Sequence, residues 1–184
     1  MKIAWGITGS GDKINETIDS MVKLVESSGY QIDVFISKAG KQVLGWYKLW
    51  DRIRGSFETV KVEIDANVPF IAGPLQIGAY DLLVVAPLTA NSAAKIAYGI
   101  EDTLLTNAVA QTLKGSTPVI LFPVDQFPGT VETIAPDGRV VSIRTRQIDL
   151  DNVERLRQMK GVTVVSSISE IIALVKEYLP HTDF

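Results

Sequence analysis

The segment from Asp81 to Ala86 constrains the fold more than any other part of this sequence. After the aspartate every residue is apolar, and four of the five are leucine or valine. A continuous run of branched apolar residues is typical of a strand buried on both faces, as in a parallel sheet covered by helices on each side. A second run of this kind lies at Val119 to Val124. Together the two runs favour an α/β fold.

Strand and helix patterns alternate along the rest of the chain. Strand patterns at Ile3 to Trp5 and Ile32 to Ile36 enclose Asn15 to Ser28, where apolar residues recur at helical spacing. This βαβ order predicts a doubly wound, Rossmann-like, mainly parallel sheet with helices on both faces. The later elements that we expect are helices at 92–98 and 103–114, a helix starting near 151, a strand at 162–165 and a helix with a capping box at 167–170.

Two segments depart from this alternation. Thr130 to Thr145 contains two alternating runs around Pro136-Asp137-Gly138, which predicts a β-hairpin excursion. Trp46 to Asn67 mixes aromatic and basic residues and resembles an irregular excursion more than a regular crossover. We see no repeat, low-complexity tract or linker, and 184 residues suit one domain, so we expect a single domain over residues 1–184.

The amino-acid inventory excludes several kinds of chemistry. The chain has no cysteine, so it offers no disulfide, thiolate nucleophile or cysteine-ligated metal centre. Its single histidine, His181, lies near the C-terminus, which argues against a Ser/His/Asp triad or a histidine-based metal site. We therefore expect no bound metal.

Charge and hydropathy limit the kinds of partner that this chain is expected to bind. A formal net charge of −3 argues against non-specific binding to nucleic acid or to anionic membranes. The first residues, Met1 to Gly6, lack the apolar stretch of a signal peptide, and no apolar run reaches the length of a transmembrane helix. We expect a cytoplasmic protein that contacts neither membranes nor nucleic acid.

Three loops that follow predicted strands carry small polar residues: Gly6 to Gly11, Ser37 with Lys38, and Pro87 to Asn91. The carboxyl ends of parallel strands share one edge of the sheet, and ligands bind there. Backbone N–H groups, hydroxyls and helix N-termini in such loops suit a phosphate. Taken singly, each loop has a plainer explanation, because glycines serve tight turns and Ser37, Asn91 or Asp102 with Thr103 would cap helices. Their convergence is what favours a ligand site.

The first loop matches neither of the common nucleotide motifs. Gly6 to Gly11 lacks the Gly-Lys-Ser/Thr of a Walker A loop, which argues against nucleoside triphosphate hydrolysis. It also lacks the G-x-G-x-x-G spacing, which weakens the case for NAD.

The segment from Ala86 to Thr106 reads A-P-L-T-A-N-S-A-A-K-I-A-Y-G-I-E-D-T-L-L-T. It resembles the signature A-P-x-[ST]-A-N-[ST]-x-A-K-x-A-x-G-[IL]-x-D-x-L-[LT] of the FMN-binding flavoprotein superfamily. That superfamily includes cysteine decarboxylases, flavin prenyltransferases and dihydromethanopterin reductase-like proteins. The resemblance covers residues 1–114 well, and within the superfamily Met1 to Gly11 is most similar to the archaeal flavoproteins of the archaeoflavoprotein group.

The resemblance implies FMN as the cofactor, held near a subunit interface of a homo-oligomer, a trimer or a multiple of one. By position, it assigns the phosphate and ribityl chain to Gly6, Thr8, Gly9, Ser10 and Ser37. It places the isoalloxazine ring along the loop formed by Pro87, Leu88, Thr89, Ala90 and Asn91. It closes the site with Asp102, Thr103 and Leu104.

The function that the resemblance favours is redox chemistry. FMN would take electrons from a donor, by resemblance a ferredoxin, and pass them to another protein or to a dihydropterin. Oxidative decarboxylation is disfavoured, because the segment Ser37 to Trp46 holds no histidine and the decarboxylases' substrate-clamping motif is absent after Phe122. The sequence identifies no catalytic residue.

Two alternatives stay open. A flavin prenyltransferase needs a basic allyl-phosphate site, which Arg139, Arg144 and Arg146 would supply, although arginines on a hairpin more often form a solvated face. A flavin carrier or storage protein would bind FMN without accelerating electron transfer. The aromatic residues Trp46, Tyr47 and Trp50 fit a shelter for the ring, a partner surface or ordinary packing at a subunit interface.

Overall fold

The computed structural model describes residues 1–178, so His181 lies outside the described residues. The elements in chain order are β1 (Lys2–Ile7), α1 (Ile14–Ser28), β2 (Gln31–Ile36), α2 (Lys38–Trp46), α3 (Trp50–Ser56), β3 (Thr59–Val62), α4 (Ala72–Gln76), β4 (Leu82–Leu88), α5 (Ala90–Ala97), α6 (Leu104–Thr112), β5 (Val119–Pro123), β6 (Thr130–Ile134), β7 (Val140–Arg144), α7 (Gln147–Arg157), β8 (Val162–Val164) and α8 (Ile168–Tyr178).

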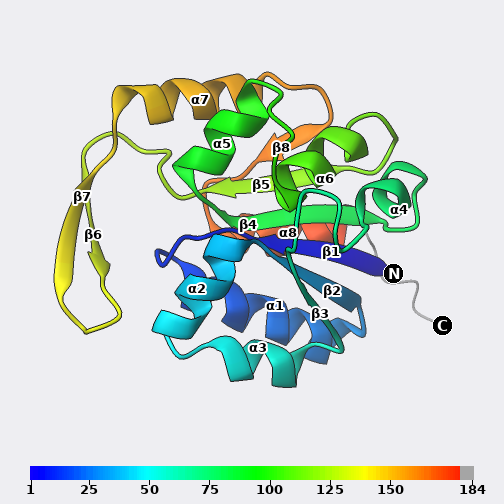
Figure 1. Cartoon of the computed structure of the whole chain (residues 1–184), viewed down its shortest axis with the longest axis horizontal. Coiled ribbons are helices and arrows are strands. Elements are labelled where there is room, and N and C mark those ends of the chain that lie inside the picture. The colour runs from blue at the N-terminus through cyan, green and yellow to red at the C-terminus, as the bar shows by residue number, and fades with distance from the viewer. Residues whose placement is uncertain (179–184) are drawn as a thin grey trace.

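Six of the strands form one parallel sheet in the order β3-β2-β1-β4-β5-β8 (Figure 1). The chain winds outward in one direction from β1 through β2 to β3 and then returns to continue in the other direction with β4. The switch point therefore lies between β1 and β4, where a crevice opens at the carboxyl ends of the strands in folds of this kind. The predicted doubly wound α/β fold is confirmed.

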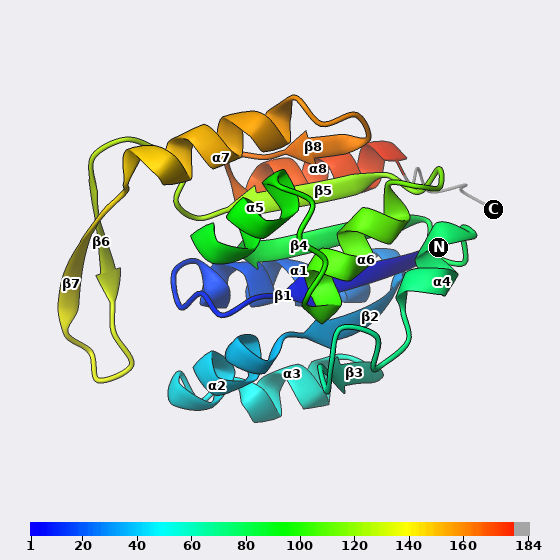
Figure 2. The ribbon, with the colours of Figure 1, turned by 45° about the horizontal axis from the view of Figure 1, so that its top comes forward.

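Alternate residues of each central strand enter two separate cores. In β1, Ile3, Trp5 and Ile7 pack on the face covered by α1, α2, α3 and α8, whereas Ala4 packs on the face covered by α4 to α7 (Figure 2). The Trp5 ring also satisfies its one donor, because Nε1 donates to the carbonyl of Ala86 at 2.8 Å. Burial on both faces is the reason that these strands read as unbroken apolar runs.

The hairpin of β6 and β7 projects beyond the carboxyl ends of the strands, between β5 and α7 (Figures 1 and 2). Val131 pairs with Ile143 and Thr133 pairs with Val141, so this face of the ribbon is largely apolar. The hydroxyl of Tyr47, just after α2, donates to the carbonyl of Ile134 at 2.7 Å and ties the hairpin to the main body. The predicted hairpin is confirmed.

The interpretation of Trp46 to Asn67 as an irregular excursion is wrong. The segment forms α3 and an edge strand, β3, which is parallel to β2. Leu49, Ile53 and Phe57 recur at helical spacing and are all buried, but exposed aromatic and basic residues between them hid the pattern. Phe57 completes the packing with an edge-on contact to Trp5, ring centroids 5.3 Å apart.

Helix α7 also begins earlier than the expected start near 151. It runs from Gln147 because the carboxylate of Asp149 accepts from the backbone N–H of Arg146 at 3.2 Å and from its guanidinium at 2.7 Å. The capping acceptor is Asp149, and residue 146 is an arginine and not the usual serine or threonine, so the sequence pattern did not reveal this helix start.

Candidate functional site

Thr8 joins the two loops at the switch point. Its hydroxyl donates to the carbonyl of Pro87 at 2.7 Å and accepts from the N–H of Thr89 at 2.9 Å. The side chain is buried, 1% exposed, and its single donor is already in use. Thr8 therefore holds the loop after β1 in register with the loop after β4.

The loop after β1 owes its shape to glycines that lie against neighbouring elements. A Cβ on Gly9 would lie 2.6 Å from the Cβ of Ala39, and a Cβ on Gly11 would overlap the ring of Tyr47. Ser10 lies between them and is mostly buried. The loop thus presents backbone and one hydroxyl in a narrow space, which is the arrangement that phosphate-binding loops use.

Ser37 caps α2 at the end of β2. Its Oγ accepts from the N–H of Gly40 at 2.9 Å, and its own N–H donates to the carbonyl of Ile7 at 3.0 Å. The hydroxyl proton of Ser37 has no acceptor among residues 1–178, so it is free to donate to a ligand.

Threonines cap the two helices that follow β4. Thr89 accepts from the N–H of Ser92 at the start of α5, and Thr103 caps α6 through a reciprocal pair with Thr106. Asn91 is therefore not the cap of α5. Its side chain is exposed and forms no side-chain hydrogen bond in the part of the chain that the structure describes.

Glu63 is a buried carboxylate that the sequence analysis missed. Oε2 accepts from the N–H of Lys38 at 2.9 Å and Oε1 from the N–H of Leu104 at 2.8 Å, so one side chain bridges the N-termini of α2 and α6. No local motif marks this residue, since it simply follows β3. Glu63 is only 9% exposed and neutralises two helix ends at once.

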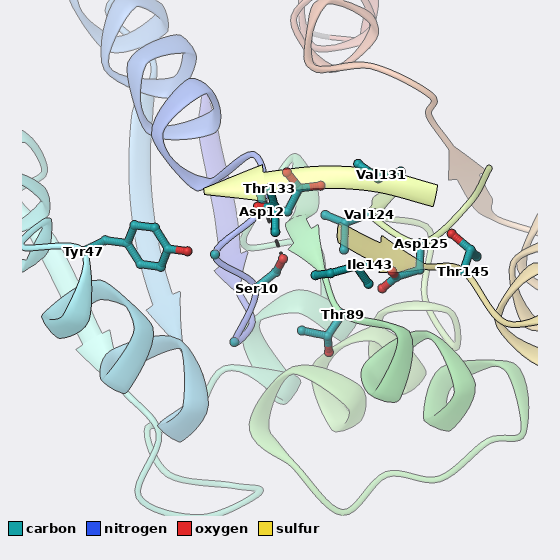
Figure 3. A pocket seen from close by; sticks show the side chains of 12 residues that line it. Ser10, Asp12, Tyr47, Thr89, Val124, Asp125, Val131, Thr133, Ile143 and Thr145 are labelled. Atoms are coloured by element: carbon teal, nitrogen blue, oxygen red, sulfur yellow. Dashed lines mark hydrogen bonds between the residues drawn. The ribbon is translucent and has the colours of Figure 1, made fainter. Parts of the chain in front are cut away.

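A cavity of about 320 Å³ opens between the loop after β1, the end of β5 and the hairpin (Figure 3). This volume lies at the low end of the range of about 300–1,000 Å³ for small-molecule sites. The cavity is lined by the β1 loop, by residues after α2, β4 and β5, and by one face of the hairpin. The lining residues are Gly9, Ser10, Gly11, Asp12, Tyr47, Thr89, Val124, Asp125, Val131, Thr133, Ile143 and Thr145.

The charged residues that line the cavity are both acidic. Asp12 and Asp125 line it, and no lysine or arginine does. Burial raises the pKa of both carboxyl groups, and the charge of Asp149 raises that of Asp125 further, with a smaller contribution from Asp12. The guanidinium of Arg146 donates to Asp149 at 2.7 Å, and this hydrogen bond lowers the pKa of the Asp149 carboxyl group.

The structure distributes the predicted site residues over three environments. Gly9, Ser10 and Thr89 line the cavity. Thr8, Leu88 and Leu104 are buried behind it, and the N–H of Leu104 is occupied by Glu63. Gly6 and Pro87 are buried in β1 and β4, and Ala90 and Asn91 form the first turn of α5. Ser37 and Thr103 cap α2 and α6, and Asp102 is exposed and paired with Lys95 at 2.8 Å. Their roles in cofactor binding stay predictions.

Comparison with known proteins assigns the family, because the flavoprotein family matches residues 1–179. The chain belongs to the flavoprotein family. An uncharacterised protein of Methanocaldococcus jannaschii is 48% identical over 97% of this chain and 96% of its own length. A dihydromethanopterin reductase (acceptor) of the same organism is 35% identical over 74% of this chain and 58% of its own length.

A solved structure agrees with this assignment. The crystal structure of Burkholderia xenovorans DmrB in complex with FMN, described as a cubic protein cage for redox transfer, has a TM-score of 0.82 and 39% identity. The match covers 97% of this chain and 94% of that one. The FMN-dependent cysteine decarboxylase TvaF, at 20% identity and a TM-score of 0.64, shares the fold. The resemblance to the archaeoflavoprotein and dihydromethanopterin reductase-like group is confirmed.

The residues present fit FMN. The N-terminus of α5 lies at the switch point, and the glycine loop and the free Ser37 hydroxyl supply donors for a phosphate. Within residues 1–178 no three His, Cys, Asp or Glu side chains gather in a way that would hold a metal ion. No helix in the described part of the chain is long and apolar enough to cross a membrane.

Proposed function

We propose that this chain binds FMN at the switch point and works as a redox protein that carries electrons from a donor to a dihydropterin-type acceptor. The observation that carries the proposal is the narrow glycine loop after β1, which lines an open cavity at the carboxyl ends of the strands, together with the free hydroxyl of Ser37 on the loop after β2. Support comes from the dihydromethanopterin reductases among its relatives and from FMN in DmrB.

The chain's own residues bind and orient the cofactor. Gly9, Ser10 and Ser37 would donate to the phosphate, while Thr89 and Asn91 would lie along the ring. Bound FMN would supply reversible electron transfer, and the protein would tune it through burial and hydrogen bonds. Thr8 and Glu63 keep the binding loops and helix ends in place.

The proposed donor is a ferredoxin. Four cations on the segment of α2 and α3, Lys38, Lys41, Lys48 and Arg54, have no ion-pair partner within residues 1–178, although the whole chain carries a net charge of −3. A local positive surface beside the site would attract an acidic electron carrier. Reduction by ferredoxin should therefore slow steeply as ionic strength rises, and reversal of Lys48 to Glu should slow it further.

The proposed assembly is a homo-oligomer built from trimers, with the flavin near subunit interfaces. Large apolar side chains are exposed on this single chain, notably Ile64, Phe70 and Ile77 at 67%, 68% and 81%. Contiguous exposed apolar surface marks interfaces. DmrB of Burkholderia xenovorans, a relative at 39% identity, is described as a cage. Size-exclusion chromatography with light scattering tests the prediction, and a monomer at micromolar concentration would contradict it.

The prenyltransferase alternative loses its phosphate site. Arg139 pairs with Asp137 and Arg146 with Asp149, and neither these arginines nor Arg144 lines the cavity. A flavin prenyltransferase of Thermoplasma acidophilum is 28% identical over 72% of this chain and 71% of its own length. The hairpin arginines therefore supply no allyl-phosphate site in this cavity.

The test begins with the absorbance spectrum of the purified protein, with and without added FMN. The proposal predicts bound flavin, bleaching on anaerobic titration with reduced ferredoxin, and recovery of the oxidised spectrum on addition of a dihydropterin. A protein that takes up no FMN would refute it. Flavin that is reduced no faster than free FMN would instead support a storage protein.

A further inference from the structure

Asp125 is a carboxylate in the cavity that forms no ion pair within residues 1–178. It follows β5 directly, is half-buried, and lines the cavity. The charges of Asp149 and Asp12 raise the pKa of Asp125; Arg146 lowers it, but its guanidinium is hydrogen-bonded to Asp149. The backbone N–H of Ala90, at the start of α5, also acts on this carboxylate, and no other residue of the described chain 1–178 donates a side-chain hydrogen bond to it. A carboxylate accepts several hydrogen bonds, so Asp125 can accept further hydrogen bonds from a ligand.

The rest of the cavity suits a flat ring. Val131 and Ile143 form an apolar pair on the inner face of the hairpin, and Val124 adds to it from the end of β5. Figure 3 shows Asp125 beside Thr145 on one side of this space and Asp12 beside Ser10 on the other. Apolar walls with a few placed polar groups are the usual design of a heterocycle site.

We propose that Asp125 accepts the paired N–H groups of a flat nitrogen heterocycle of the 2-amino-4-oxopyrimidine class, the ring system of the pterins, while the inner face of the hairpin covers the ring. The inference rests on the proposed function and names the residue that selects its acceptor. A ring N–H and an adjacent amino group donate two parallel hydrogen bonds to one carboxylate, as a guanidinium does.

The test compares two probes that differ at one position of this edge. Pterin carries the amino group, and lumazine has a carbonyl oxygen in its place. Each is titrated by calorimetry into the FMN-loaded protein, whose flavin content is first checked by absorbance. The variants are Asp125→Asn and, as a matched control, Asp51→Asn at an exposed residue of α3 that does not line the cavity.

The expected result is that pterin binds at least about tenfold more tightly than lumazine, since a charge-assisted pair is lost with the amino group. Asp125→Asn should abolish this preference, keep its flavin and unfold at the same temperature as the parent, whereas Asp51→Asn should retain the preference. Equal binding of the two probes, or an unchanged preference in Asp125→Asn, would overturn the inference.

Two further outcomes separate this inference from the proposed function. Loss of FMN in Asp125→Asn would overturn the inference, because it would assign the carboxylate to the cofactor. A parent protein without flavin would refute the proposed function, and the inference with it. A flavin-loaded protein that shows no preference between the probes would refute the inference alone.

Discussion

Replacement of Glu63 by Gln tests whether one buried carboxylate holds two helix ends together. The carboxylate accepts from the N–H of Lys38 and from that of Leu104. Glutamine keeps one acceptor oxygen and turns an NH₂ group toward the second N–H, which leaves a buried donor without a partner. It also removes the negative charge from the N-termini of α2 and α6.

The magnitude follows from these losses. A hydrogen bond to a charged group contributes about 1.5–3 kcal/mol, and an anion at a helix N-terminus about 0.3–1 kcal/mol. One charge-assisted bond and two helix-end interactions together give a loss of about 3 kcal/mol in the free energy of unfolding. For a chain of this size that corresponds to a fall in Tm of about 6–12 °C.

Chemical denaturation of the parent and of Glu63→Gln measures the effect, with Glu58→Gln as the matched control. Glu58 is exposed, lies five residues earlier and forms no ion pair within the described residues, so its substitution should change stability by less than about 0.5 kcal/mol. If Glu63→Gln were as stable as Glu58→Gln, the reasoning about the two helix ends would be wrong.

Two further predictions concern the β1 loop and α7. Gly9→Ala should weaken FMN binding at least about tenfold, because the new Cβ would displace the loop from Ala39. In the control Gly45→Ala the new Cβ meets nothing within 4 Å, so this variant should bind FMN normally. Equal FMN affinities of the two variants in a fluorescence titration would contradict the prediction for Gly9. Arg146 lowers the pKa of Asp149, so the pair should stabilise the protein at neutral pH and lose this contribution as the pH falls through the folded-state pKa. Asp149→Asn should flatten the acid limb of the stability profile, and identical profiles would count against the cap.

Local sequence patterns were enough to predict the helices, strands and turns whose defining residues lie within the element itself. The apolar runs around Val84 and Ile120 marked strands buried on both faces, and the capping residues Ser167 and Glu170 marked the start of α8. The hairpin was equally readable, because alternation and the Pro136-Asp137-Gly138 turn both lie within a short stretch. The loops that follow β1, β2 and β4 were correctly expected to converge, since parallel strands end at the same edge of the sheet.

What the sequence determined by itself was therefore the α/β class, the family motif and the small residues of the binding loops. Only the tertiary structure showed that Glu63 bridges two helix ends, that Thr8 locks the β1 loop to the β4 loop, and that Asp125 faces a cavity covered by a distant hairpin. The physical reason is the range of the interactions. A periodic apolar pattern is decided by neighbours a few residues apart, whereas Glu63 and Leu104 are 41 residues apart in sequence and Thr8 and Pro87 are 79 apart, so their meeting depends on how the whole sheet is wound.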